Sequence, residues 1–344
     1  MIPKGSRGKK LKIQVLAGGI SHERDISLKS GRRVADALTD FGAEVVIREP
    51  DHNLLANIKK DKPDVIFPCL HGASGEDGAL RDILVLSGVP FVGATAAGSR
   101  LAWDKSIAKI LVSREGISTP PSITLPKDTF RELDAEEVLK NVASGISLPV
   151  VVKPARSGSA QGVTIVKTLS ALNRAMIDAY VYCDVAIIEK YIEGTELAIS
   201  VVDLGAGPIA LPPVEIEPRD GKYGYDERYI AGETNFYIPA RVKPQVNEEA
   251  SRLAIQVHGI LNLRHLSRVD VIVDKKGICW FLEANVAPGL TETSLLPQAI
   301  AASGNSLGEV YYSGSTFAAK SSPSSLYDFL SSHIPAVVMA APYS

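Results

Sequence analysis

The sequence predicts an α/β protein of several domains, and three observations carry this prediction. The first third alternates apolar strand-like segments with helix-like ones, which is typical of an open parallel sheet. The middle holds two apolar strands around a loop of small residues, and the last third contains a hairpin with charged side chains at alternate positions. At roughly 150 residues per domain, 344 residues fit two or three domains.

The elements of the first third follow one another as strand and helix. Leu11–Leu16 is strand-like, and Ala17-Gly18-Gly19 forms a turn after it. Val34, Ala37 and Leu38 then have the i, i+3, i+4 spacing of a helix face. The further elements expected here are strands at 43–47, 64–67 and 89–92 and a helix at 80–86. Ligands of such a sheet bind at the carboxyl ends of its strands.

From about Asp104 the pattern changes. A helix is expected at 105–112, strands at 148–153, 163–167 and 186–192, a loop at 220–233 and a helix at 247–261. Residues 321–325 are rich in serine and resemble a flexible linker. We therefore expect domains at 1–104, 105–196 and 197–320, followed by a tail at 321–344.

The C-terminal hairpin places ionic and amide groups on one face. Side chains alternate faces along a strand, so Arg268 shares a face with Asp270, and Glu283 shares one with Asn285. With Lys276-Gly277 as a two-residue loop, Asp270 lies opposite Glu283 and Arg268 opposite Asn285. Oxygen ligands on a rigid sheet suit Mg²⁺ bridging phosphates, and an adjacent arginine suits the phosphate. A surface ladder of salt bridges is the alternative interpretation.

Two other segments could contact a nucleotide. The loop Lys153–Gly162 joins two apolar strands, and its small residues would let backbone N–H groups approach phosphate oxygens. It lacks the GxxxxGK[ST] pattern of a P-loop, and plain flexibility also explains its composition. The segment Ile187–Glu196 ends an apolar strand with charged residues, so its main chain could contact adenine and a later carboxylate the ribose. A charged strand exit explains this second segment equally well.

Composition excludes several classes of function. Hydrophobic residues make up 45% of the chain and charged residues 22%, as in ordinary soluble proteins. A net charge of −2 gives no support for nucleic acid or an anionic membrane as a partner. Three scattered cysteines without metal-type spacing suit a reducing cytosol. With no signal-peptide or membrane-spanning run in the sequence, we expect a cytoplasmic enzyme.

Together these segments resemble the ATP-grasp superfamily and, within it, the D-alanine–D-alanine ligases. The resemblance spans about Lys12 to Gly308, and the joint order of its blocks is highly specific. The blocks are GGISHERDISLKSG at 18–31, HGASGEDG at 71–78, Asp104-Lys105, KPARSGSAQG at 153–162, YGYDERY at 223–229, LEANVAPGLT at 282–291 and SLLP at 294–297. The implied fold is an ATP-grasp fold of three domains: an open parallel α/β sheet, a central α+β lobe with the glycine-rich loop, and a C-terminal α+β domain with a mainly antiparallel sheet.

The resemblance also implies a set of ATP and metal contacts. ATP would lie between the central and C-terminal domains. The ATP-binding residues implied are Lys105, Lys153 and Arg228 near the phosphates, Glu189, Lys190 and Ile192 at the adenine, and Glu196 at the ribose. The metal ligands implied, for two Mg²⁺ or Mn²⁺ ions, are Asp270, Glu283 and Asn285, in agreement with the hairpin argument.

Substrate contacts follow from the same resemblance. Glu23 would receive the ammonium group of the first D-alanine, linked to Ser159 and Tyr229 in a hydrogen-bond network. Arg268 and the Gly289 N–H would stabilise the oxyanion of acyl transfer. Ser294 and the Leu295 N–H would hold the carboxylate of the second D-alanine. His71 lines the first-substrate side in the family, while a capping or core histidine in a glycine-rich turn remains the alternative.

Four positions depart from the usual family pattern or bear on specificity. Gly224 and Arg228 stand where an aspartate and a lysine are more frequent, and Arg228 keeps the positive charge. Ala160 replaces a frequent serine and removes one possible phosphate donor. Tyr229 stands where ligases that make D-alanine–D-lactate often carry phenylalanine, so its hydroxyl favours the dipeptide product.

The expected function is an ATP- and Mg²⁺-dependent ligase that joins two D-alanines through D-alanyl phosphate for peptidoglycan precursor synthesis. D-Alanine and ATP would be its small-molecule partners, and a homodimer is common in the family. One alternative is a ligase that takes D-lactate or D-serine as second substrate. A second is a nucleotide-binding regulator on the same scaffold, against which the intact ionic residues argue.

Overall fold

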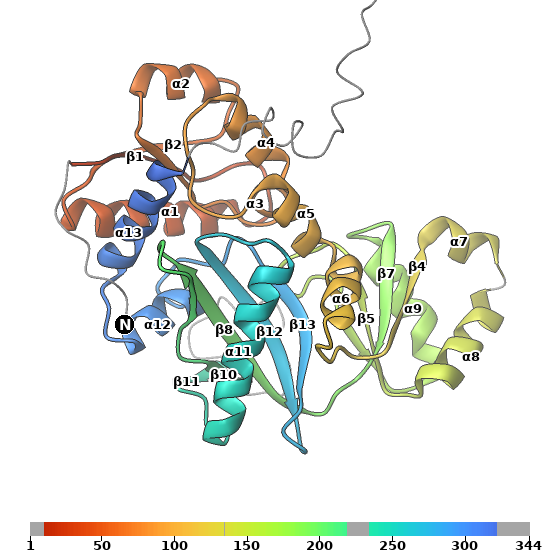
Figure 1. The fold of residues 1–344 in the computed structure, drawn as a ribbon. Coiled ribbons are helices and arrows are strands. Elements are labelled where there is room, and N and C mark those ends of the chain that lie inside the picture. The colour runs from red at the N-terminus through yellow and green to blue at the C-terminus, as the bar shows by residue number, and fades with distance from the viewer. Residues whose placement is uncertain (1–9, 134, 219–233, 322–344) are drawn as a thin grey trace, which may run out of the picture.

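Three sheets organise the chain in the computed structural model, which describes residues 10–133, 135–218 and 234–321 (Figure 1). The N-terminal sheet, the four-stranded central sheet and the large C-terminal sheet lie in different parts of the molecule, with the C-terminal sheet in the middle (Figure 1). Within the described ranges, no helix is long and apolar enough to cross a membrane.

The N-terminal sheet is parallel and has the strand order β2-β1-β3. Its strands are β1 (Lys12–Leu16), β2 (Glu44–Arg48) and β3 (Val65–Pro68), and its helices are α1 (Arg24–Asp40), α2 (Leu54–Asp61), α3 (Ala73–Glu76), α4 (Ala79–Leu86) and α5 (Ala96–Trp103). The fourth strand expected at 89–92 is reduced to one parallel bridge between Ile66 and Phe91. Gly88 and Gly93, both at positive φ, turn the chain on either side and keep it short.

The central sheet is antiparallel, with the order β4-β7-β5-β6. Its strands are β4 (Ser122–Pro126), β5 (Val150–Pro154), β6 (Thr164–Val166) and β7 (Val185–Lys190). Three helices, α7 (Lys127–Glu132), α8 (Ala135–Ile146) and α9 (Leu169–Tyr180), supply apolar side chains to the core of this sheet. The small-residue loop connects β5 to β6, as the sequence predicts.

The C-terminal sheet is antiparallel throughout and has the order β11-β10-β8-β12-β13, with β9 paired to β8. Its strands are β8 (Gly194–Asp203), β9 (Pro208–Ala210), β10 (Val214–Pro218), β11 (Thr234–Tyr237), β12 (Leu266–Asp274) and β13 (Cys279–Asn285). Helix α11 (Pro244–Ile260) packs on it (Figure 1). Helix α6 (Lys105–Arg114) adds Ala108 and Val112 to the same core, and the Lys105 N–H bonds the Ala155 carbonyl after β5, so α6 contacts both sheets.

The hairpin β12–β13 has the predicted residue pairs but reaches them by a different route. Arg268 pairs with Asn285 and Asp270 with Glu283, which confirms the prediction. Asp274, however, bonds Ile278 across a three-residue loop, and a bulge between Asp270 and Val271 then shifts the register back. The two-residue loop expected at Lys276-Gly277 is therefore wrong.

This bulge decides which side chains reach the core. Val271 pairs with Phe281, and both lie in one apolar cluster together with Val269 and Ala284. In a regular strand Phe281 and Glu283 would share a face. The extra residue, Leu282, reverses the alternation, so that Phe281 is buried while Glu283 lies beside Asp270.

The end of the described chain returns to the N-terminal sheet. Helices α12 (Leu295–Ala302) and α13 (Leu307–Lys320) join strands β1, β3, β8 and β10 in a single apolar cluster. Tyr311 of α13 packs edge-on against Phe67 of β3, with 5.6 Å between ring centroids. Figure 1 shows α13 beside α1. One core therefore joins the first and last parts of the chain.

Gly31→Ala tests the packing of α1 on the turn after β1. A Cβ atom at Gly31 would lie 2.3 Å from the Cβ of Ala17, so the helix must move. We expect a loss of about 1–3 kcal/mol in the free energy of unfolding, measured by urea titration. Gly145→Ala in α8 is the matched control, because a Cβ there meets no atom within 4 Å and alanine favours a helix by about 0.5–1 kcal/mol. Equal effects of the two substitutions would contradict the packing argument.

Candidate active site

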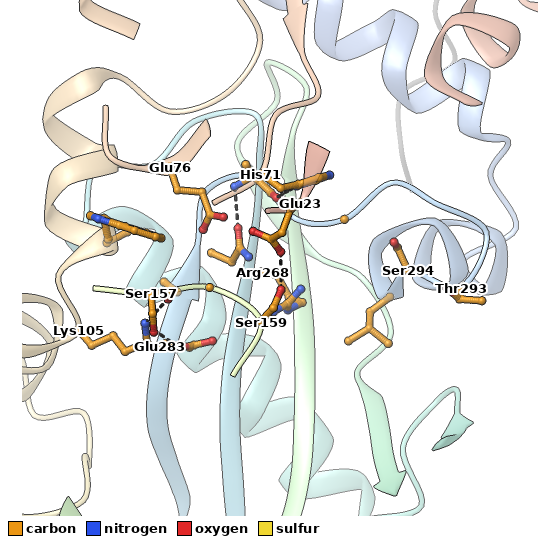
Figure 2. Close-up of a pocket in the computed structure, with 18 residues that line it drawn as sticks. Glu23, His71, Glu76, Lys105, Ser157, Ser159, Arg268, Glu283, Thr293 and Ser294 are labelled. Atoms are coloured by element: carbon orange, nitrogen blue, oxygen red, sulfur yellow. Dashed lines mark hydrogen bonds and ion pairs between the residues drawn. The ribbon is translucent and has the colours of Figure 1, made fainter. Parts of the chain in front are cut away.

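A polar pocket opens where the three sheets meet (Figure 2). Its walls come from the loop after β1, the turn before α3, the start of α6, the β5–β6 loop, β12–β13 and the segment before α12. The lining residues are Glu23, His71, Glu76, Ala102, Trp103, Lys105, Ser157, Gly158, Ser159, Arg268, Glu283, Ala284, Asn285, Ala287, Gly289, Thr293, Ser294 and Leu295. Ten of the residues implied by the family resemblance are among them.

Glu23 connects the N-terminal sheet to the glycine-rich loop. It occupies the N-cap position of α1 but makes no capping bond, and its carboxylate instead accepts a hydrogen bond from the Ser159 hydroxyl. Ser159 has a φ of 51°, in the left-handed region that non-glycine residues seldom adopt. This strained turn presents the hydroxyl to Glu23, and strain of this kind is concentrated at functional sites.

Lys105 is fixed by the start of α6. Asp104 caps that helix by accepting hydrogen bonds from the N–H groups of Ser106 and Ile107. The buried Lys105 ammonium donates to the Ser157 carbonyl at 2.6 Å and lies 3.4 Å from a carboxylate oxygen of Glu283. Lys105 therefore places one positive charge between the glycine-rich loop and the hairpin.

The hairpin face carries a buried ion pair beside oxygen donors. Arg268 donates two hydrogen bonds to Asp270, at 2.7 and 2.8 Å, and both side chains are buried. Glu283 and Asn285 line the pocket, and the Asn285 side-chain oxygen accepts the Ala287 N–H at 2.8 Å. Two carboxylates and an amide oxygen on neighbouring strands fit Mg²⁺ or Mn²⁺, which prefer oxygen ligands. The chain within the described ranges has no group of three or more His, Cys, Asp or Glu residues that could hold a metal ion, so Asn285 is needed to complete the set.

His71 is held by protein contacts on both ring nitrogens. Its Nδ1 donates to the Ala287 carbonyl at 3.1 Å, which leaves Nε2 to accept from the Ser30 hydroxyl at 3.1 Å. Burial lowers the pKa of His71, although the nearby Glu23 acts in the opposite direction. A neutral imidazole with both nitrogens engaged serves as a link between β3 and the segment after β13, and it also lines the pocket. The two interpretations of this residue are therefore compatible.

The segment before α12 offers N–H groups to the pocket. Ser294 precedes the helix, and its hydroxyl accepts the Thr291 N–H at 3.0 Å. The first N–H groups of a helix have no partner within it and attract anions. A Cβ atom at Gly289 would lie 2.6 Å from the Ser294 hydroxyl oxygen, so a glycine at 289 allows the main chain to approach the Ser294 side chain this closely. Gly289, Ser294 and Leu295 thus lie together at one end of the pocket.

Lys153 and Glu189 form a second, buried ionic group that does not line this pocket. Glu189 on β7 lies 2.7 Å from the Lys153 ammonium and 2.5 Å from that of Lys109 on α6. Burial acts to raise the pKa of Glu189, but the charges of Lys153 and Lys109 outweigh it and hold that pKa below its ordinary value. Lys109 also donates to the Pro120 carbonyl at 3.0 Å. This cluster fixes α6 against the central sheet.

Comparison with known proteins agrees with the geometry. A family model described as "D-ala D-ala ligase C-terminus" matches residues 111–311. The D-alanine–D-alanine ligase of Pelotomaculum thermopropionicum is 36% identical over 294 residues, which cover 86% of this chain and 92% of that protein. The enzyme of the same name from Bordetella petrii is 35% identical over 299 residues, which cover 87% and 89%. The chain belongs to the D-alanine–D-alanine ligase family.

Solved structures confirm the ATP-grasp fold of this ligase family member. The crystal structure of VanG D-Ala:D-Ser ligase from Enterococcus faecalis matches with a TM-score of 0.77 and 28% identity, over 90% of this chain and 99% of that one. The D-alanine–D-alanine ligase of Bacillus anthracis, complexed with ATP, matches with a TM-score of 0.75 and 26% identity, over 90% and 97%. The three-part α/β architecture expected from the sequence is therefore correct.

The ligase residues implied by resemblance are not all brought to one place. Asp270 is paired with Arg268 and does not line the pocket, while Lys153 and Glu189 lie on the central sheet. Lys190 donates to the Ser147 carbonyl at 3.0 Å, Ile192 follows β7 and is partly buried, and Glu196 on β8 lies opposite Ile216 and Ile272. Arg228 and Tyr229, with the departure at Gly224, lie outside the described residues.

Two residues near the ligase site received no role from the sequence. Lys109 lies one helical turn after Lys105, and that spacing was its only signal. Glu76 lies within the block at 71–78, is 7% exposed and lines the pocket. Burial, and then the charge of Glu23, raise the pKa of Glu76 to about 8; the Gly72 N–H and Lys105 act against this, and Glu283 adds to it.

Glu76→Gln tests this buried acid through the pH dependence of stability. Glu76 ionises near its ordinary pKa in the unfolded chain but holds its proton up to about pH 8 in the folded protein. The folded state therefore binds the extra proton, and wild type loses stability relative to the variant as pH rises from about 5 to 8. We expect the free energy of unfolding of the variant, relative to that of wild type, to grow by more than ~1 kcal/mol over that range and to level off above it. Urea titrations at pH 5 and 8 measure this difference between the two free energies of unfolding. If the difference does not change with pH, Glu76 is ionised throughout.

Proposed function

We propose that this protein is an ATP-dependent ligase that joins two D-alanines through a D-alanyl phosphate intermediate. The products would be D-alanyl-D-alanine, ADP and phosphate, for peptidoglycan precursor synthesis. The observation that carries the proposal is the meeting of Glu23, Lys105, Ser159, Arg268, Glu283 and Ser294 around one pocket. These residues supply an ammonium acceptor, phosphate contacts, an oxyanion donor and a carboxylate subsite.

The first step activates a carboxylate. A carboxylate does not react with an amine at neutral pH until one of its oxygens becomes a leaving group, and phosphorylation by ATP provides this. Phosphoryl transfer requires cationic groups at the phosphate oxygens more than a protein nucleophile. Lys105 is buried at the pocket wall beside the glycine-rich loop, where it would contact those oxygens. Lys153 would join it by exchanging its bond to Glu189 for a phosphate, with Lys109 keeping Glu189 paired.

The hairpin would hold the divalent cations. Glu283 and Asn285 face the pocket and Asp270 lies directly opposite Glu283, so these three side chains would hold Mg²⁺ or Mn²⁺. The ions would neutralise charge on the phosphate oxygens. Glu283 already pairs with Lys105, and Asp270 with Arg268, so each acid has a cation beside it without the metal.

The second step forms the peptide bond. The free amine of the second D-alanine attacks the carbonyl carbon of the acyl phosphate, and phosphate leaves. Arg268 and the Gly289 N–H would hold the developing oxyanion, and Ser294 and the Leu295 N–H would hold the carboxylate of the attacking amino acid. The contact between Ser159 and Glu23 would keep the glycine-rich loop over the acyl phosphate and protect it from water.

D-Serine is a second candidate for the attacking substrate. The observation that favours it is the match to the D-Ala:D-Ser ligase from Enterococcus faecalis. D-Alanine has the stronger support, because the curated relatives at 33–36% identity carry the D-alanine–D-alanine name. By resemblance Tyr229 would disfavour D-lactate, and Arg228 would contact the transferred phosphoryl group.

The assembly and location are also proposals. We infer a homodimer that works in the cytoplasm, as the family resemblance implies, with ATP and D-alanine as its small-molecule partners. We also retain the domain boundaries after residues 104, 196 and 320.

Phosphate release with different acceptors tests the main proposal. We expect ATP- and Mg²⁺-dependent phosphate release with D-alanine as both substrates. With D-alanine limiting, added D-serine or D-lactate should produce little mixed product, as measured by mass spectrometry. Absence of turnover with D-alanine would reject the proposed activity, while a dominant D-alanyl-D-serine product would support the second candidate.

Glu283→Gln tests the oxygen donors of the hairpin. The substitution removes one negative charge from the pocket wall without changing the size of the side chain. We expect kcat to fall by ~100-fold or more, as when one aligned electrostatic contact is lost from a site. The circular dichroism spectrum should stay unchanged. Glu248→Gln on the exposed side of α11 is the control and should keep wild-type turnover; wild-type turnover of Glu283→Gln would remove Glu283 from the site.

A further inference from the structure

The carboxyl group of Glu76 lies at the pocket wall with one oxygen bonded to the main chain. Glu76 ends α3, and its Oε1 accepts the Gly72 N–H at 2.9 Å. Within the described ranges its Oε2 accepts no hydrogen bond. The side chain is only 7% exposed, and it lines the pocket. An acid so placed has an oxygen available to accept a hydrogen bond from a ligand in the pocket.

Glu23 and Glu76 converge on the same space. A Cβ atom on Gly158 would lie 3.4 Å from Glu23 Oε2 and 3.8 Å from Glu76 Oε1, so both carboxyl groups border the space beside this glycine. Gly72 lies between them, because its N–H bonds Glu76 and a Cβ atom there would lie 2.9 Å from Glu23 Oε2. Figure 2 shows the two labelled side chains directed toward one region of the pocket.

A cation would relieve the repulsion in this space. Burial, and then the charge of Glu23, raise the pKa of Glu76 to about 8, because two acids that share a buried site cannot both ionise at low cost. Two cations near Glu76 bond other groups: Lys105 bonds the Ser157 carbonyl and Glu283, and Arg81 bonds the Gly75 carbonyl. A primary ammonium has three N–H donors, enough to serve both carboxylates at once.

We propose that Glu76 is a second carboxylate in the subsite that receives the ammonium group of the first amino acid, and that it selects amino acids over hydroxy acids there. The proposal rests on the proposed ligase function and deepens it. Glu23 and Glu76 would accept hydrogen bonds from the ammonium group on two sides, while Ser159 orients Glu23. With a pKa of about 8, Glu76 holds its proton at neutral pH, and the positive charge of the ammonium group would displace that proton.

Trapping with hydroxylamine isolates the first subsite. Hydroxylamine attacks the carbonyl carbon of an acyl phosphate, the carbon–oxygen bond to phosphate breaks, and a hydroxamate and free phosphate result. The rate of hydroxamate formation reports the acyl donor, because D-alanine that attacks as second substrate gives the dipeptide instead. We compare D-alanine and D-lactate as donors, because D-lactate keeps the carboxylate and methyl groups but has a hydroxyl in place of the ammonium. For each enzyme the measured quantity is the ratio of kcat/KM for D-alanine to kcat/KM for D-lactate.

Glu76→Gln should lower this donor ratio by at least ~10-fold, because it removes one charge-assisted hydrogen bond that only the ammonium donor makes. The change should arise mainly from a higher KM for D-alanine, with the KM for ATP unchanged. Asp77→Asn is the matched control: it makes the same carboxylate-to-amide change one residue later and retains an acceptor for the Ala79 N–H, so its ratio should equal that of wild type.

Other outcomes overturn the assignment. If the variant loses activity equally with both donors, Glu76 has only a structural role. If its donor ratio is unchanged, the ammonium is held without it. Failure of the ligase proposal would appear separately, as absence of hydroxamate from D-alanine in the wild-type enzyme.

Discussion

The register of the β12–β13 hairpin is the constraint on which the site depends. Its bulge lets Phe281 and Ala284 fill the core while Glu283 lies opposite Asp270 on the other side. Without the extra residue one of these demands would fail, because a strand alternates strictly between its faces. The hairpin thus combines a dry apolar side and an ionic side in a few residues. The remainder of the pocket is arranged around that ionic side.

Charge pairing explains how so many ionic groups remain buried. Arg268 neutralises Asp270, Lys105 lies against Glu283, and Glu189 is shared between Lys109 and Lys153. An unpaired charge at such depth would cost several kcal/mol. Two of these groups also join separate elements: Lys105 joins α6 to β13, and Glu189 joins β7 to α6 and β5. The same contacts that compensate charge therefore hold the pocket walls in position. The acids Glu23 and Glu76 differ from these pairs, because both border the space beside Gly158.

Much of this organisation could be predicted from the residues alone. Strand alternation and an expected two-residue loop predicted the pairs Arg268–Asn285 and Asp270–Glu283, and these pairs are correct because the bulge offsets the three-residue loop that the structure has. The bulge could not be predicted, since it is decided by how Phe281 fits a core built from distant strands.

The motifs placed Glu23, Lys105 and Ser294 at one pocket. They did not show that Asp270 would bind Arg268, or that Lys153 would bind Glu189, because those distances depend on side-chain rotamers and on how α6 sits between two sheets. Glu76 was overlooked because its significance arises only when the fold brings it to Glu23.

The packing of α13 has a consequence for the order of folding. This helix, at the end of the described chain, supplies Tyr311 to the core under β3, and α1 lies beside it. During synthesis from the N-terminus, the first sheet leaves the ribosome long before its covering helix does. The apolar face of this sheet that α13 covers stays uncovered until roughly 250 further residues have been synthesised, since β3 ends at Pro68 and α13 begins at Leu307. The first-made part of this chain is therefore among the last to be completed.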